Sequence, residues 1–555
     1  MKDEEEDTIK SAVTDIQQQL HSLLDSISGV QILKGKWSLI TTKLTSLHHR
    51  LSDLSTTAAN NNNPLSSDLL RSISATCSSA ASLSSLCHSP TPPAGKLKTQ
   101  SDVDSLSAKL DAHTNDLQVI INSGLLAQNA DVSSSARRES VRAEIGYLMT
   151  RLQIGSAQSK SSALESLIGL LQEDAKNLLI AVAQGIIPVL VRLLDCSSSS
   201  ELKEKSVSAI AKISTEDSSK HDLLAEGLVL LNNLMRVLES GSVYAKEKSC
   251  IVLRVLSNSK ENARAIGSRG GISSLLEICR EGTPNSQALA ARVLRNLAVF
   301  EDVRENFVEE NSVLILLALC NSGTALAQEN AIGCLCNLVA GDDDLKLLVA
   351  REGGIQTLKD IWNSVPSAQS LEVVVEMVRA MASCPNIAEF LVADGFLSRL
   401  VGILSCGILG VRIAAAKALS HLAYNTKTRK ELGEMGCIPH LVSMLDGKAV
   451  EEREAAAELL SNLMSYVGNR RIFSKEDRGI VSAVQLLNPS LDTLDKKHVL
   501  SILGSLLHSK KCQKQIVAAG ASAHLQKLVE ADIEGAKKLL DSLGRGKLWG
   551  VFNRS

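Results

Sequence analysis

The chain has 555 residues and a net charge of −2, with 44% hydrophobic but only 2% aromatic residues. This balanced charge gives no basic field over the whole molecule, so nucleic acid is not an expected partner. Many small aliphatic and few aromatic residues suit thin layers of helices and argue against a large β-sandwich. No uninterrupted apolar run reaches the roughly 20 residues of a membrane-spanning helix, so no membrane insertion is expected.

The 12 cysteines are scattered, and most of them lie inside apolar helical runs. Cys334-Leu-Cys336 and Cys87-His88 come nearest to metal-ligand spacing, but no Cys-x-x-Cys pair occurs. Free cysteine packs as a small hydrophobic residue, so we expect buried thiols and no metal site. Without a visible signal peptide a reducing compartment is expected, in the cytoplasm, the nucleus or both.

Residues 1–127 are predicted to form a helical domain with four amphipathic segments, near 5–28, 35–57, 65–88 and 98–124. In the second segment the apolar residues are spaced three and four apart, which places them on one helical face: Trp37, Ile40, Leu44, Leu47 and Leu51. Asn- and Pro-rich stretches separate the segments. Four long helices with short connections predict an antiparallel four-helix bundle.

A polar stretch over residues 128–140 is expected to link this bundle to the rest of the chain. It contains Arg137-Arg138-Glu139-Ser140, the basic-basic-x-Ser form that basophilic kinases favour. Ser140 is therefore a candidate phosphorylation site at the start of the next helix. A phosphate there would add roughly two negative charges and favour that helix.

From residue 141 to 543 the chain repeats one phrase, a small turn followed by an apolar helix. Successive turn positions are 41 to 43 residues apart: Gly185, Gly227, Gly270, Asn311, Gly353, Gly395, Gly436, Gly479 and Gly520. A period of this length is typical of helical repeats that stack into a solenoid. The first unit is irregular, as expected of a terminal repeat that presents one face to water.

Three helices fit within each unit. A short helix ends four residues before the turn, and a second begins after it, with Pro188 or Pro439 in its first turn. The third helix is the longest. The phrase Gly436-Cys-Ile-Pro-His-Leu-Val and the Leu-x-Asn-Leu of the third helix make residues 141–543 resemble about nine or ten armadillo repeats. The resemblance implies an all-α fold, a right-handed superhelical solenoid preceded by the bundle, with residues 544–555 as a tail.

Armadillo proteins bind extended peptides in a concave groove lined by third helices, often through an Asn from each repeat. The resemblance places Asn296, Asn337, His421 and Asn462 in that slot. An Asn side chain offers both a donor and an acceptor, so it can pair with a peptide backbone. The alternative is that these amides join helix ends or loops within a unit. Both interpretations remain open at this point.

Basic side chains fall on or beside the same helix face: Arg254, Arg292, Arg295, Arg379 and Lys417. Such a stripe would attract an acidic or phosphorylated peptide, and solvated surface charge is the alternative. Importin-α grooves carry a Trp four residues before the Asn, where this chain has Arg292, Gly333, Lys417 and Glu458. Nuclear-import cargo is therefore not an expected partner.

Catalytic motifs are not found in the sequence. The glycines near residues 267–271 and 544–546 lack the remainder of a phosphate loop. No Ser-His-Asp spacing or pair of carboxylates stands at fixed helical offsets. We therefore expect no enzyme activity, no cofactor and no small-molecule substrate.

A helical domain followed by an armadillo array resembles the plant U-box ubiquitin ligases. The Cys-Pro-Ile and Asp-Pro phrases of a U-box do not occur here, so the resemblance implies a way of binding partners and not ligase activity. The chain is also similar to vacuolar armadillo proteins, but Lys2 stands where their acylated glycine would be. The sequence thus predicts a non-enzymatic adaptor for other proteins. The alternative is a substrate-recruiting component of a ubiquitin-ligase pathway.

Overall fold

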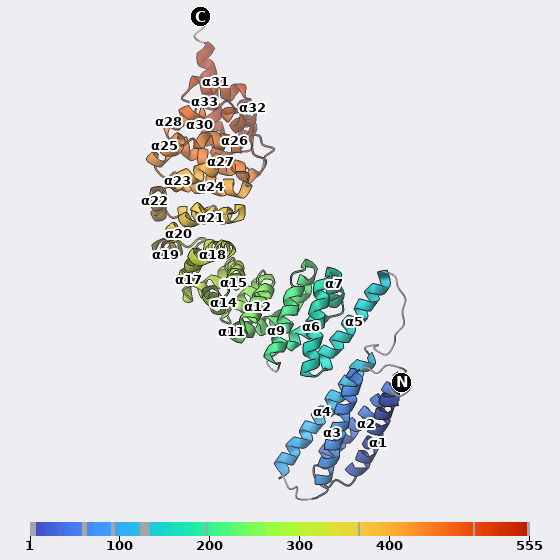
Figure 1. Cartoon of the computed structure of the whole chain (residues 1–555). Helices are drawn as coiled ribbons and strands as arrows, with labels where there is room; N and C mark the ends of the chain where they lie inside the picture. The colour runs from blue at the N-terminus through green and yellow to red at the C-terminus, as the bar shows by residue number, and fades with distance from the viewer. Residues whose placement is uncertain are drawn as a thin grey trace. The chain divides into compact units, whose positions relative to one another are not determined.

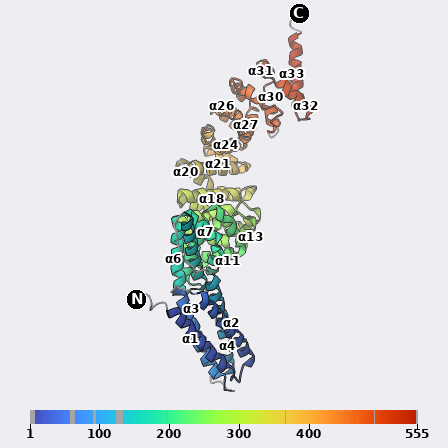
Figure 2. The ribbon, with the colours of Figure 1, turned by 90° about the vertical axis from the view of Figure 1, so that its right-hand side faces the viewer.

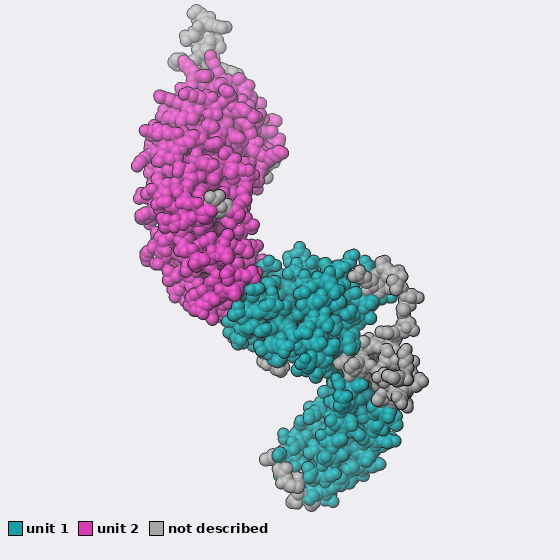
Figure 3. Space-filling view, viewed as in Figure 1, with its two compact units in different colours: residues 1–255 teal, residues 256–555 magenta. Residues whose placement is uncertain are grey.

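The computed structural model of the chain describes residues 7–57, 64–89, 95–122, 134–195, 198–364, 367–491 and 494–551. These residues form 33 α-helices and one short 3-10 helix, and no strand occurs among them. The predicted all-α class is therefore confirmed. The chain divides into two compact units, residues 1–255 and residues 256–555 (Figure 3).

The first helical domain contains four long helices: α1 (Asp7–Ile27), α2 (Lys34–Thr57), α3 (Pro64–Leu86) and α4 (Lys96–Asn122). The four predicted segments are confirmed, and the ribbon shows them lying side by side (Figure 1). The largest packing contacts join α1 to α3 and α2 to α4, so helices that alternate in sequence are neighbours. The predicted apolar face of α2 is fully buried, with Trp37 at 1% exposure and Leu44 at 0%.

Helices α5 (Ser134–Ile154) and α6 (Ala157–Glu173) precede the regular repeats. The prediction of a linker up to residue 140 was wrong from residue 134 onward, because Ala136 and the charged residues that follow are strong helix formers. Residues 128–133 of that linker lie outside the described residues. Ser140 is exposed but lies in the second turn of α5, beyond the first turn where the helix dipole acts. A phosphate on Ser140 would therefore not stabilise α5 in the way predicted.

Nine layers of three helices follow in the described part of the chain, and those from α18 to α27 can be followed as stacked ribbons in Figure 2. The first helices are α7 (Ala175–Ala183), α10 (Lys220–Ala225, after the 3-10 helix Asp217–Ser219), α13 (Lys260–Gly267), α16 (Glu301–Glu309), α19 (Asp343–Arg351), α22 (Pro385–Ala393), α25 (Thr426–Glu434), α28 (Val467–Phe473) and α31 (Lys510–Ala518). The second helices are α8 (Ile186–Leu193), α11 (Gly227–Ser240), α14 (Gly271–Glu281), α17 (Ser312–Ser322), α20 (Gly354–Asn363), α23 (Phe396–Ile403), α26 (Cys437–Leu445), α29 (Gly479–Gln485) and α32 (Ala521–Glu530). The third helices are α9 (Ser200–Ile213), α12 (Val243–Leu256), α15 (Pro284–Leu297), α18 (Ala325–Leu338), α21 (Ala368–Ala382), α24 (Leu409–Leu422), α27 (Val450–Leu463), α30 (Lys496–Ser505) and α33 (Ala536–Val551).

The predicted turn positions separate the first and second helices of each layer. All of them except Gly479 have a positive φ, for example 87° at Gly353 and 50° at Asn311. Glycine adopts this left-handed conformation without a steric cost, and Asn tolerates it better than other residues. The sequence period therefore reflects a backbone requirement that recurs once in each layer.

The third helices of the second unit pack directly on one another from α15 to α30. Small residues permit this close approach, and Ala414, Ala415 and Ala418 of α24 have no exposed surface. The predicted tail from residue 544 was wrong as far as residue 551, because α33 continues to Val551. Residues 552–555 lie outside the described residues.

No single helix in the described ranges is both long and apolar enough to cross a membrane. Helices α7 and α8 meet that condition only as a pair, and a bend of 84° separates them.

Candidate functional site: the third-helix wall

Helices α15, α18, α21, α24 and α27 of the second unit pack on one another in this order (Figure 1), and we call the side that they share the third-helix wall. Eight of the predicted groove residues lie on these helices: Arg292, Arg295, Asn296, Asn337, Arg379, Lys417, His421 and Asn462. His421 is exposed, and the others are partly exposed. Arg254 lies in the last turn of α12, in the first unit.

The three asparagines of the wall donate to the layer before their own. Asn296 Nδ2 donates to the Ser257 hydroxyl at 3.0 Å. Asn337 Nδ2 donates to the backbone carbonyl of Arg295, also at 3.0 Å. Asn462 Nδ2 donates to the hydroxyl of Ser420 on α24, at 2.7 Å. These amides therefore join adjacent layers, whereas the alternative considered from the sequence had them joining parts of a single unit.

Arg295 crosses from α15 to α18. A Cβ atom at Gly333 would collide with its guanidinium, so the missing side chain of Gly333 makes room for it. Its Nη1 lies 3.9 Å from Oε1 of Glu329, a side chain only 6% exposed. Beside this pair, Arg292 Nη1 donates to Oδ1 of Asn330 at 3.5 Å. Arginine pairs planar oxygen groups well, and these two arginines present such donors along the wall.

Farther along the wall the charges are mixed. Arg379 Nε donates to Glu376 Oε2 at 2.6 Å, whereas Lys417 has no ion-pair partner within the described ranges.

Partial desolvation lowers the pKa of His421 below its usual 6.5. Glu458 opposes this shift in the pKa of His421, and the positive charge of Arg379 adds to it. The neutral form of the His421 ring is therefore favoured at pH 7.

Sequence reasoning missed several polar residues that complete the wall. Glu329 accepts a hydrogen bond from Ser370 at 3.3 Å, and Glu458 accepts one from Ser420 at 2.9 Å. A helical count could have found both, since Glu329 lies eight residues before Asn337 and Glu458 lies four before Asn462, on the same helix face. The partners of Asn296 and Asn462 could not be found in this way, because they belong to other helices.

The wall offers little for covalent chemistry. Cys336 is partly exposed beside Asn337, but burial raises the pKa of its thiol to about 11. A thiol in that state is a poor nucleophile at neutral pH. Within the described ranges, no group of three or more His, Cys, Asp or Glu side chains is placed to hold a metal ion.

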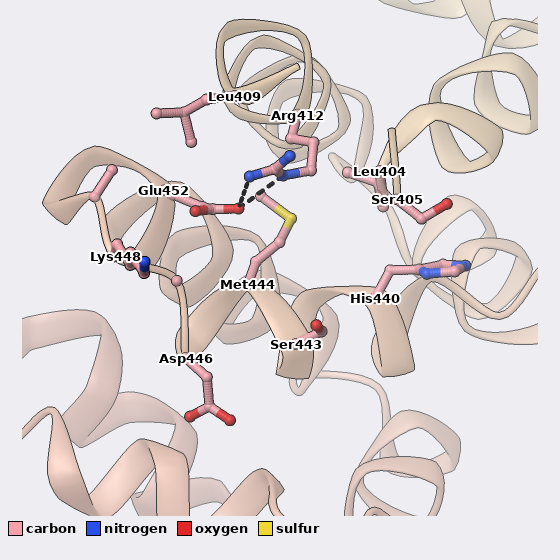
Figure 4. A pocket seen from close by; sticks show the side chains of 12 residues that line it. Leu404, Ser405, Leu409, Arg412, His440, Ser443, Met444, Asp446, Lys448 and Glu452 are labelled. Carbon is pink, nitrogen blue, oxygen red and sulfur yellow. Dashed lines mark hydrogen bonds and ion pairs between the residues drawn. The ribbon is translucent and has the colours of Figure 1, made fainter. Parts of the chain in front are cut away.

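A separate cavity of about 750 Å³ lies between the second-to-third-helix loops of the sixth and seventh layers. Figure 4 shows the ion pair that forms one side of it, with Arg412 Nη2 at 2.7 Å from Glu452 Oε1. Arg412 Nη1 also donates to the carbonyl of Cys406 at 2.7 Å. The side chains of His440 and Asp446 point away from this pair (Figure 4). The polar groups do not converge on one point as catalysis requires, and the pair joins α24 to α27.

Comparison with known proteins agrees with this architecture. A family described as a domain of unknown function, DUF7032, matches residues 14–125. The armadillo/beta-catenin-like repeat family matches residues 174–215. The solved structure of an engineered protein superimposes with a TM-score of 0.62 at 23% identity, covering 73% of this chain and 98% of its own. That similarity shows the fold.

Two curated proteins of Arabidopsis thaliana are similar over part of their length. U-box domain-containing protein 8 is 29% identical over 157 residues, which cover 28% of this chain and 41% of that protein. Protein CELLULOSE SYNTHASE INTERACTIVE 2 is 25% identical over 162 residues, 29% of this chain and 8% of that protein. The matches therefore span less than half of either relative.

The turn period, the three-helix layers and the packed third helices define a helical-repeat protein of the armadillo class. By its fold the chain is an armadillo-repeat protein, its residues 14–125 match the DUF7032 family, and its similarity to the two plant proteins is distant. Armadillo-repeat proteins are generally non-catalytic protein-binding scaffolds, and no catalytic domain is identified in this chain.

Proposed function

We propose that the chain is a non-catalytic interaction scaffold whose third-helix wall binds an extended, acidic or phosphorylated segment of another protein. The observation that supports this most directly is Lys417, which is partly exposed and lacks an ion-pair partner in the described part of the wall. Arg292 also presents donors there, and its hydrogen bond to Asn330 is long, at 3.5 Å. Guanidinium and ammonium groups bind carboxylate and phosphate oxygens by charge-assisted hydrogen bonds.

The spacing of the wall suits an extended chain. Packed helices lie roughly 8–10 Å apart, and an extended segment rises roughly 3.3 Å per residue. One side chain from each layer would therefore meet about every third residue of the partner. Because the asparagine amides already donate between layers, the basic side chains carry more of the proposed recognition than the sequence suggested.

Photo-cross-linking in cells tests this proposal. His421 on the wall, replaced by p-benzoylphenylalanine, should cross-link to partner polypeptides. The same replacement at Glu389, exposed on the first helix α22, serves as the control and should not. Arg292→Ala with Lys417→Ala should remove the cross-links from position 421. Equal cross-linking at both positions, or cross-links that persist in the double variant, would exclude the wall as the binding surface.

A second candidate is recruitment of a substrate to a ubiquitin ligase. Its support is the 157-residue similarity to U-box domain-containing protein 8. The proteins identified by cross-linking at position 421 can be tested as substrates of reconstituted ubiquitin transfer. The rate of transfer, measured with and without this chain, separates the two functions. A rate that depends on the chain favours recruitment, and an unchanged rate favours a scaffold outside that pathway.

A further inference from the structure

An apolar cavity of about 150 Å³ lies between the fourth and fifth layers, lined by α16, α17, the end of α18 and α19. Phe307 and Leu338, exposed by 0% and 1%, lie at its base. Val308 and Leu314 line its mouth with 53% and 50% of their surfaces exposed. A cavity of this size and lining holds a group about as large as benzene. It therefore matches one large aliphatic or aromatic side chain.

The apolar mouth differs from the equivalent positions of the two adjacent layers. Val308 lies three residues before the turn position Asn311, and Leu314 lies three residues after it. The equivalent residues are Gly267 and Ser273 in the third layer, and Ala350 and Gln356 in the fifth. The neighbouring layers stack with small or polar residues at these positions. The two large apolar side chains of the fourth layer are therefore not a requirement of the stacking itself.

Negative charge surrounds the mouth. Glu309 and Glu310 follow Val308 directly, Glu352 lines the cavity, and Glu305 lies one helical turn before Val308 on α16. All four side chains are exposed, and the described residues provide no ion-pair partner for any of them. The opposing positive charge is that of Arg351, the last residue of α19, which directly precedes Glu352. The net field at this mouth attracts positive charge and repels anionic lipid and nucleic acid.

We propose that this acid-rimmed pocket is a docking site for a protein partner that inserts one large apolar side chain from a lysine- or arginine-rich segment. The base of the pocket provides the apolar contact, and the four glutamates select the basic flanks. Interfaces depend mainly on a few buried apolar or aromatic side chains within a polar rim. First and second helices line most of the site, Leu338 comes from the end of α18, and the basic residues of the third-helix wall are not part of it.

Selection from a displayed library of random 16-residue peptides on the full chain provides the test. The matched variant is Val308→Ala with Leu314→Gln, which introduces the residues of the fifth layer and should keep the melting profile of the wild type. Wild type should enrich sequences with a large apolar residue among lysines and arginines, and the variant should not. A fluorescein-labelled enriched peptide should bind the variant about tenfold more weakly or worse.

Several results would overturn the proposal. The first is equal enrichment on both proteins, and the second is enrichment of acidic sequences. The third is binding of the wild type, but not of the variant, to phosphatidylserine vesicles. If the double variant unfolds, Glu309→Lys with Glu310→Lys replaces it, since both residues are exposed. This charge reversal should reduce binding of the same peptide, and unchanged binding would contradict the proposal. Arg292→Ala with Lys417→Ala should leave the peptide's affinity unchanged, which separates this site from the wall.

Discussion

Asn337 on α18 donates its side-chain amide to the backbone carbonyl of Arg295 on α15, at 3.0 Å. Arg295 lies in the last turn of α15, where helix carbonyls have no intrahelical donor. An amide 42 residues away in sequence therefore completes the hydrogen bonding of a helix end. The asparagine side chains that join adjacent layers are part of the fold of the third-helix wall. Whether they also bind a ligand is a separate question, which the next variant tests.

Asn337→Ala should weaken the end of α15. Loss of the donor leaves the Arg295 carbonyl unpaired, which costs about 1–2 kcal/mol in the free energy of local opening. Hydrogen exchange of the last turn of α15 measures this change. Asn321→Ala, at an exposed position on α17, is the control and should not alter that exchange. Unchanged exchange in Asn337→Ala, with weaker partner binding, would assign the amide to the ligand instead.

Gly333→Ala should fail to stabilise the protein. Replacing glycine by alanine inside a helix normally contributes about 1 kcal/mol, but here the new Cβ would collide with the Arg295 guanidinium. We expect an unchanged or lower melting temperature. Gly169→Ala on α6 has open space around its Cβ and should raise it. A similar rise for both variants would mean that Arg295 moves away freely.

Arg412→Met should be more harmful than the double variant Arg412→Met/Glu452→Leu. The single change leaves the Glu452 carboxylate, 6% exposed, without its partner, and such losses cost roughly 3 kcal/mol. The double change removes both charges together. Unfolding midpoints of the wild type, both single variants and the double variant give the coupling. Additive effects would show that the ion pair contributes nothing to the stability of the two layers.

The helical domain should lose stability in mild acid through His113. This side chain is 8% exposed, and its Nε2 lies 2.9 Å from the Thr76 hydroxyl. Burial, with a smaller effect of Lys109, lowers the pKa of His113 below 6.5. The unfolded chain therefore takes up the proton first, so stability is full above about pH 7 and falls as the pH decreases through 6.5.

Hydrogen exchange of α3 and α4 at pH 5.5, compared between wild type and His113→Gln, measures this effect. Gln can keep a hydrogen bond to Thr76 but does not titrate. When the pH is lowered from 7.5 to 5.5, the protection of these helices should decrease less in the variant than in the wild type. An equal loss of protection in both proteins would assign the acid sensitivity to other groups.

Local patterns in the sequence identified most of the helices and turns. The αL requirement at a turn depends on a single residue and its neighbours, so Asn311 could be placed among glycines without knowledge of the fold. The apolar face of α2 followed from spacings of three and four, and the burial of Trp37 confirms it. The start of α5 was less predictable, because helix-forming residues extend into the polar stretch that was predicted to be a linker.

The pairing of side chains across layers was decided by the tertiary structure. Arg295 lies over Gly333, and Asn462 reaches Ser420, because packed third helices bring residues about 40 positions apart into contact. Sequence period shows which residues occupy equivalent slots, since that depends on local helix geometry. Which of those slots face each other depends on distances and angles between helices, and these arise only when the layers are packed.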